Sequence, residues 1–248
     1  MKASVFKTLY GASVRAMALL ALLAPHAVRA QSFCASDRQP QPTQLLERFI
    51  SADCASCWQD TGAAKAARGE IALDWVVPGN LGENAPLSAV ATRDAAQRLD
   101  AAVDQALGAN SIVKRSAVRG LPGATLRVAH GLPVTGYIGA SIALTPGQDA
   151  AEDQPWTAWL ALVETLPQGT EGSTVARNLV RNTFKATWNG RKQLSKTERP
   201  RFVEQRSMGL PDGVDPRRLR VIGWVEDARG QVRAAAASRC PPDNGRAP

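Results

Sequence analysis

The spacing of apolar residues predicts alternating strands and helices in the first half of the chain. Apolar runs at residues 45–50 and 71–77 predict two buried strands. Residues 57–67 between them are rich in alanine and precede cations and Gly69, which is typical of a short helix that ends at a glycine. Strand, helix and strand in this order predict a right-handed crossover between parallel strands. Residues 92–107 repeat apolar positions at helical spacing and predict a second helix.

The pattern changes after residue 111, where short β-prone runs alternate with turns rich in Gly and Pro. The predicted strands are 111–118, 124–128, 137–144 and 156–163. Residues 219–226 and 231–236 flank a turn that ends in Gly230, which predicts a hairpin. Residues 174–188 are compatible with a helix or a strand, and both assignments stay open.

Residues 1–30 have the order of features that is typical of a secretory signal peptide. The basic residues Lys2, Lys7 and Arg15 occur without any acidic residue, and the apolar stretch 17–23 is followed by small residues before Gln31. The apolar stretch is too short to span a bilayer, which takes about 20 residues. We expect cleavage at Gln31 and an exported protein, periplasmic or secreted, without membrane attachment. Retention of the segment as an anchor is the alternative.

The predicted cleavage changes the charge balance. The chain has 30 Lys and Arg residues against 22 Asp and Glu residues. Four of the basic residues lie in the predicted signal peptide, so 26 would remain against 22. That balance is ordinary for a solvated surface and gives no reason to expect a nucleic-acid partner.

The histidine content limits the possible chemistry. His130 is the one histidine outside the predicted signal peptide, and no Gly-x-Ser-x-Gly sequence occurs. We therefore exclude a serine hydrolase with a Ser-His-Asp triad, and we expect neither a metal site nor a cofactor. We expect His130 in a turn or at the surface.

The segment Cys54-Ala55-Ser56-Cys57 carries the clearest candidate chemistry, because two thiols at this spacing can close and reopen a small disulfide. In a redox role, Cys54 would attack a protein disulfide and Cys57 would resolve the mixed disulfide. Backbone amides at a helix start favour a Cys54 thiolate, whereas the charge of Asp53 disfavours it. The alternative is a non-catalytic binding or assembly module with structural disulfides, in which residues 78–86 and the β-rich half form the binding surface.

Four cysteines follow the predicted signal peptide, at positions 34, 54, 57 and 240. They allow three pairings. The short spacing favours Cys54–Cys57, which leaves Cys34–Cys240 near the two ends of the fold. A zinc site formed by all four sulfurs stays open as an alternative.

Several segments, taken in order, are similar to a known family. They are Phe49-Ile50-Ser51-Ala52-Asp53-Cys54-Ala55-Ser56-Cys57, Ile71-Ala72-Leu73-Asp74-Trp75, Asn178-Leu179-Val180-Arg181, Trp188-Asn189-Gly190 and the hairpin from Val221 to Ala236. Over residues 43–238 the chain resembles the secreted thioredoxin-like proteins grouped as domain of unknown function 1223. The resemblance implies an α/β fold with a thioredoxin-like core and a β-rich C-terminal extension.

We accordingly expect five parts in the chain. They are a signal peptide (1–30), an N-terminal arm (31–42), a thioredoxin-like core (43–128), a β-rich C-terminal part packed on the core (129–240) and a disordered tail (241–248). The resemblance also implies a cis-proline against the dithiol. The nearest candidate is Pro122, with Pro133 as a second choice, although neither follows the Thr that the family has there. Trp58-Gln59 likewise replaces the family's Pro-Pro.

Overall fold

The structure is a computed structural model that describes residues 33–102, 107–147, 155–189 and 202–241. Eleven strands and two α-helices occur in these residues. The strands are β1 (Cys34–Ala35), β2 (Gln44–Ser51), β3 (Glu70–Val77), β4 (Ser111–Ala117), β5 (Thr125–His130), β6 (Tyr137–Thr145), β7 (Trp156–Leu166), β8 (Arg177–Trp188), β9 (Phe202–Gly209), β10 (Leu219–Glu226) and β11 (Val232–Ala237). The helices are α2 (Ala55–Trp58) and α3 (Arg93–Ala102).

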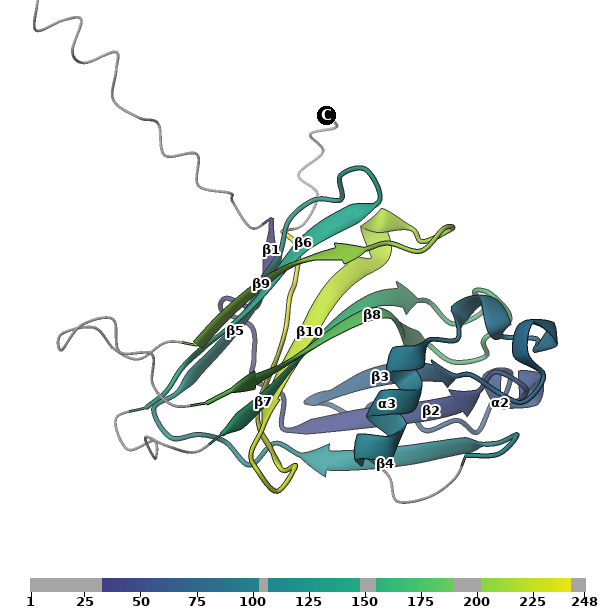
Figure 1. Ribbon diagram of the computed structural model, residues 1–248, viewed down its shortest axis with the longest axis horizontal. Coiled ribbons are helices and arrows are strands. Elements are labelled where there is room, and N and C mark those ends of the chain that lie inside the picture. The colour runs from purple at the N-terminus through teal and green to yellow at the C-terminus, as the bar shows by residue number, and fades with distance from the viewer. Residues whose placement is uncertain (1–32, 103–106, 148–154, 190–201, 242–248) are drawn as a thin grey trace, which may run out of the picture. The chain divides into compact units, whose positions relative to one another are not determined.

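The strands form two sheets (Figure 1). The smaller sheet has the order β1-β5-β6-β9 and is antiparallel throughout. The larger sheet has the order β11-β10-β7-β8-β3-β2-β4. In it, β3 pairs in parallel with β2 and with β8, whereas the other pairs are antiparallel. The parallel strands β2 and β3 are buried along nearly their whole length, which explains why most of their residues are apolar.

The side chains of β7 alternate between two hydrophobic clusters, one on each face of the larger sheet. Trp159 and Val163 join the cluster that includes Leu99 of α3. Leu160 and Leu162 join the cluster that the smaller sheet shares. Because successive side chains of a strand point to opposite faces, one central strand serves both clusters. Figure 1 shows α3 in front of the part of the sheet formed by β2, β3 and β4.

A glycine in β10 allows the two sheets to approach closely. A Cβ atom on Gly223 would lie 2.6 Å from Cγ1 of Val128 and 2.9 Å from Cδ1 of Ile142. Val128 belongs to β5 and Ile142 to β6, so these side chains occupy the space above the glycine. The contact between the sheets therefore depends on the missing side chain at position 223.

The predicted α/β fold with a thioredoxin-like core is wrong, because the described residues are mostly strands in two large sheets. The helix predicted at 57–67 is reduced to the four residues of α2. Residues 59–69 contain two glycines and no large apolar side chain, so a helix there would gain no packing against the sheet. The ambiguous segment 174–188 forms β8, which adds a strand beside β3.

Other predicted elements are confirmed. The strands predicted at 45–50 and 71–77 are β2 and β3, and they are parallel. The predicted C-terminal hairpin is the antiparallel pair β10 and β11. The predicted helix at 92–107 corresponds to α3, and its later part includes residues outside the described ranges.

The predicted boundary between the core and the C-terminal part does not coincide with the division into two sheets. The boundary between residues 128 and 129 falls within β5, and the larger sheet takes strands from both predicted parts. The predicted signal peptide lies outside the described residues, and so does residue 242 onward of the predicted tail. Among the helices that the structure describes, none has the length and hydropathy needed to cross a membrane.

Candidate functional site

Both expected disulfides are present, Cys54–Cys57 and Cys34–Cys240. No described cysteine is free, so the alternative of a zinc site with four cysteine ligands does not apply to this oxidised form. The Cys34–Cys240 bond joins residues 206 positions apart in the sequence. Cys34 is 1% exposed, which marks this bond as a structural element rather than a reaction centre.

His130 lies beside the Cys34–Cys240 bond and not at the surface. It is the last residue of β5, where it pairs with Cys34 of β1, and it is 4% exposed. Its Nδ1 lies 2.9 Å from the carbonyl oxygen of Gly131, and its Nε2 has no hydrogen-bond partner among the described residues. Burial lowers the pKa of His130, and the Gly131 carbonyl partly opposes that shift. The predicted turn or surface position was therefore wrong.

The Cys54–Cys57 disulfide lies at the start of α2, just after β2. The Sγ of Cys54 accepts the backbone N–H of Cys57 at 3.2 Å. The Oγ of Ser56 lies 3.5 Å from the same sulfur, within hydrogen-bond range for sulfur. Cys54 is only 8% exposed, whereas Cys57 is partly exposed and Ser56 is exposed. The more accessible cysteine is thus Cys57, opposite to the roles expected from the sequence.

Asp53 fixes the loop that follows β3. Its carboxylate accepts the backbone N–H of Asn80 at 2.7 Å and that of Leu81 at 3.2 Å. A Cβ atom on Gly79 would lie 2.2 Å from Oδ1 of Asp53, so the loop can close on the carboxylate only with glycine there. The Asp53 carboxylate is therefore hydrogen-bonded to backbone N–H groups of the loop beside the dithiol.

A buried cluster of charged residues lies behind the dithiol. Asp74 accepts hydrogen bonds from Nε and Nη2 of Arg48, each at 2.7 Å, and from Nη1 of Arg177 at 2.9 Å. All three side chains are almost fully buried. Two guanidinium groups share one carboxylate, so the cluster carries an excess positive charge.

The same cluster holds α2 in place. Nη2 of Arg177 donates to the carbonyl oxygen of Trp58 at 2.8 Å and to that of Cys57 at 3.5 Å. Its guanidinium also lies 4.6 Å from the centre of the Trp58 ring. Trp58 is 4% exposed and donates Nε1–H to the carbonyl oxygen of Glu171 at 2.8 Å. Trp58 is therefore a packing residue, and so is the fully buried Trp75.

Sequence reasoning missed this cluster, although the sequence held a signal. Arg48 and Asp74 each interrupt an apolar strand, and they are direct register partners in the parallel pair β2 and β3. A charge in the middle of a buried strand needs a partner of opposite sign. Two opposite charges in strands that are predicted to be neighbours therefore predict an ion pair. No pattern in the sequence around Arg177 identifies it as the third member of the cluster.

Pro122 does not occupy the expected position. No peptide bond among the described residues is cis, so the proposed cis-proline is contradicted for Pro122 and for Pro133. Pro122 lies in the connection between β4 and β5, with its carbonyl oxygen 2.0 Å from where a Cβ on Gly147 would be. The neighbouring Leu121 packs on the cluster shared by the two sheets, which holds this connection there.

The fold and this site define a β-rich, two-sheet protein with a short-range disulfide beside a buried cationic cluster. No protein-family model matches the chain, and no curated protein matches it. Among solved structures, the chain is similar to HBP35 of Porphyromonas gingivalis, with a TM-score of 0.41 and 11% identity over 80% of this chain and 74% of that chain. At this distance the similarity assigns neither a family nor a function.

Proposed function

We propose that the Cys54–Cys57 disulfide exchanges with thiols of protein partners in an oxidising, extracytoplasmic compartment. The observation that carries the proposal is the setting of Cys54, whose sulfur accepts the Cys57 N–H and lies within reach of the Ser56 hydroxyl. Hydrogen bonds to a sulfur favour its anionic form, so Cys54 is suited to leave as a thiolate. The presence of two disulfides fits a compartment of this kind.

The proposed exchange begins at Cys57, the more exposed of the two cysteines. A partner thiolate attacks Sγ of Cys57, the Cys54–Cys57 bond breaks, and Cys54 leaves with the bonding electron pair. A second partner thiolate then attacks the partner's sulfur in the mixed disulfide and releases Cys57 as a thiolate. The partner is oxidised by two electrons and gains a disulfide, and this chain gains two thiols that take up the protons of the partner's thiols.

The buried cationic cluster supports this direction of exchange. Arg177 contacts the carbonyl oxygens of Cys57 and Trp58, and it shares Asp74 with Arg48. An excess positive charge at this depth acts through a low dielectric, and it therefore favours a nearby thiolate more than a surface cation does. Its effect on both cysteines is to stabilise the reduced, anionic state.

The test is a redox titration that follows each disulfide separately. The exported chain is equilibrated in graded glutathione buffers, quenched with acid, alkylated and analysed by mass spectrometry. We expect Cys54–Cys57 to be reduced in the folded protein under conditions that leave Cys34–Cys240 intact. A Cys54→Ser variant should accumulate glutathione on Cys57, and the matched Cys57→Ser variant should accumulate less on the buried Cys54. Reduction of Cys54–Cys57 only when the protein unfolds would contradict the proposal.

The alternative is a non-catalytic binding or assembly module in which both disulfides are structural. Two observations favour it: the low exposure of Cys54, and the attachment of the 78–86 loop to Asp53, which leaves Leu81 54% exposed. In that case a Cys54→Ala/Cys57→Ala variant keeps the fold and the ability to bind a partner, whereas Leu81→Asp removes the binding.

A further inference from the structure

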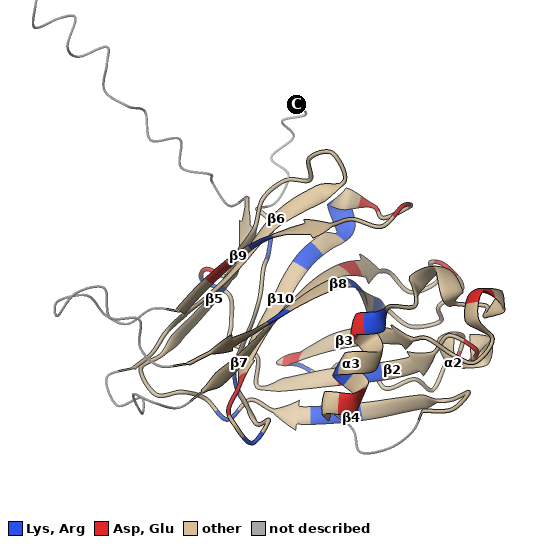
Figure 2. Cartoon of the chain, in the orientation of Figure 1, with Lys and Arg blue, Asp and Glu red and all other residues tan. Residues whose placement is uncertain are grey.

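A cavity of about 340 Å³ lies between the buried cationic cluster and β10. Four of its lining residues are cationic, namely Arg48, Lys65, Arg177 and Arg220, and none of the described lining residues is acidic. Ala72 and Val175 add apolar surface. The volume falls in the range of small-molecule sites, which runs from about 300 to about 1,000 Å³. Figure 2 shows where basic and acidic residues lie along the strands of the larger sheet.

Arg220 is partly buried, and it differs from the buried arginines of the cluster because no described carboxylate pairs with it. Its Nε is buried and has no hydrogen-bond partner among the described residues. Its Nη2 donates to Oδ1 of Asn178, which is a neutral acceptor. By contrast, Arg48 and Arg177 both bond to Asp74. Arg220 is only partly exposed, and its Nε has lost contact with water without gaining an acceptor. An added anion would supply that acceptor and a counter-charge.

Asn178 is held so that it cannot turn away from Arg220. Its backbone N–H donates to Oδ2 of Asp74 at 2.7 Å, and its Nδ2 donates to the carbonyl oxygen of Ala72 at 2.8 Å. Its Oδ1 is thereby directed toward Arg220, and it also accepts from the Thr165 hydroxyl at 3.2 Å. The orientation of the Arg220 guanidinium is therefore fixed by the neutral Asn178 side chain, and its positive charge is not neutralised by that contact.

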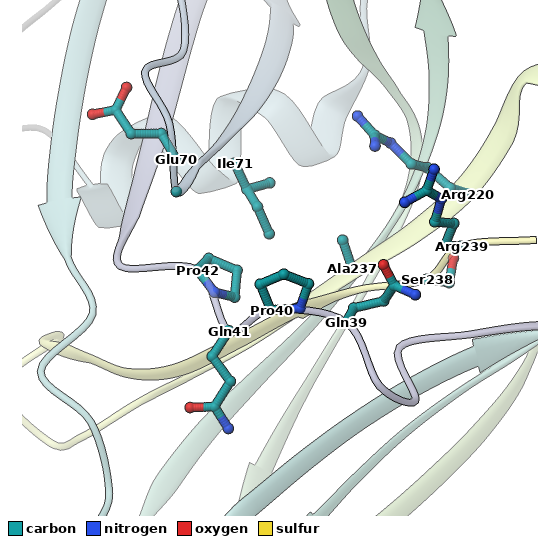
Figure 3. A pocket seen from close by; sticks show the side chains of 11 residues that line it. Gln39, Pro40, Gln41, Pro42, Glu70, Ile71, Arg220, Ala237, Ser238 and Arg239 are labelled. Carbon is teal, nitrogen blue, oxygen red and sulfur yellow. The ribbon is translucent and has the colours of Figure 1, made fainter.

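Arg220 also borders a second cavity, of about 440 Å³ (Figure 3). Pro40, Pro42 and Ile71 line it, and Arg239 lies next to Arg220 at its edge. The one acidic residue in the lining, Glu70, directs its carboxylate away from Arg220. That carboxylate is bound instead to Nε of Arg115 at 3.2 Å and to the N–H of Ala67 at 2.8 Å.

We propose that Arg220 binds the head group of a small organic oxyanion, a carboxylate or a phosphate, whose body lies against Pro40, Pro42 and Ile71. A guanidinium presents parallel N–H donors that match both head groups. Burial lowers the pKa of Arg220, but an arginine stays protonated in proteins and keeps its charge. The site does not include the dithiol, and binding requires no thiol exchange.

Isothermal titration calorimetry on the exported chain with both disulfides intact tests the proposal. The probes are phenyl phosphate, benzoate and uncharged benzyl alcohol, which share a ring and differ in the head group. We expect saturable binding of phenyl phosphate or benzoate and none of benzyl alcohol. Binding of one anion alone distinguishes a phosphate ligand from a carboxylate ligand. Failure of both anions to bind, or equal binding of the alcohol, would overturn the proposal.

Variants locate the binding. Arg220→Gln should weaken the anion by about tenfold or more, because one charge-assisted contact contributes about 1.5–3 kcal/mol. Arg229→Gln, in the exposed turn of the C-terminal hairpin, is the matched control and should leave the affinity unchanged. Unchanged affinity in Arg220→Gln would refute the site. Cys54→Ala/Cys57→Ala should bind the anion normally, which separates this result from the proposed thiol exchange.

A second measurement does not depend on the folding of a variant. The Nε–H resonance of Arg220 in the wild-type protein, assigned by NMR, should shift in a saturable manner on addition of the anion that binds. A resonance that stays in place while the anion binds elsewhere would overturn the assignment to Arg220.

Discussion

Arg48 and Asp74 face each other across the parallel strands β2 and β3, and their side chains form a two-point ion pair with both N–O distances at 2.7 Å. The pair is buried, so each charged group is in contact with the other instead of with water. Arg177 completes the arrangement from β8. The ion pair therefore joins the middle of the larger sheet to the segment that carries the dithiol.

Replacement of Asp74 tests this arrangement. Asp74→Asn leaves two buried guanidinium groups without a carboxylate, and we expect the free energy of unfolding to fall by about 3–5 kcal/mol. Asp37→Asn is the control, since Asp37 forms an exposed pair with Arg127 and should change stability by less than about 1 kcal/mol. Urea denaturation of both variants measures the difference. Equal effects would show that the buried cluster does not stabilise the fold.

Protonation of His130 should make stability depend on pH. Burial holds the pKa of His130 below its ordinary value, so at mildly acidic pH the unfolded chain binds a proton that the folded chain does not. The free energy of unfolding should therefore fall as the pH drops below about 6.5, the ordinary value for histidine. Urea denaturation at several pH values measures the slope. His130→Gln should flatten it, and an unchanged slope in that variant would exclude His130 as its source.

The two disulfides should differ in their contribution to stability. By loop entropy, closure of a 206-residue separation by Cys34–Cys240 stabilises the fold by about 5 kcal/mol. The three-residue separation of Cys54–Cys57 stabilises it by only about 2 kcal/mol. Thermal unfolding of Cys34→Ala/Cys240→Ala and of Cys54→Ala/Cys57→Ala compares them. A larger loss from the second pair would contradict this ranking.

The close approach of the sheets at Gly223 gives a packing prediction. Gly223→Ala places a methyl group 2.6 Å from Cγ1 of Val128, and we expect a loss of about 1–3 kcal/mol from overpacking. Gly139→Ala in β6 is the matched control, because a Cβ there meets nothing within 4 Å. Addition of Val128→Ala to Gly223→Ala should recover part of the loss. The measurement is urea denaturation of the three variants.

Local patterns in the sequence predicted the parallel pair β2 and β3, the C-terminal hairpin and both disulfides. They failed on the fold class, because the order of strands in the larger sheet is set by contacts between distant segments. The single register pair between β3 and β8 joins Asp74 to Leu179, and no local pattern reports it. The ambiguous segment 174–188 forms a strand that pairs with β7 along nearly its whole length, a contact that its apolar spacing does not report.

The candidate site was likewise predicted only in part from the sequence. The cysteine spacing revealed the dithiol, but the roles of its members depend on exposure, which the sequence does not report. The position of Pro122 along the chain suggests the cis-proline, whereas the packing of Leu121 places the connection between β4 and β5 against the cluster between the sheets. No sequence pattern marks Arg220, because what distinguishes it is a buried Nε without a hydrogen-bond partner among the described residues, and this depends on the fold.

The Cys34–Cys240 bond also has a mechanical consequence. A force that pulls the chain from its two ends reaches Cys34 and Cys240 before any strand between them, and the covalent bond transmits it directly. The sheets enclosed by the bond then carry no tension. Stretched in this way, the oxidised protein should not lengthen between the two cysteines, and after reduction the whole chain between them becomes extensible.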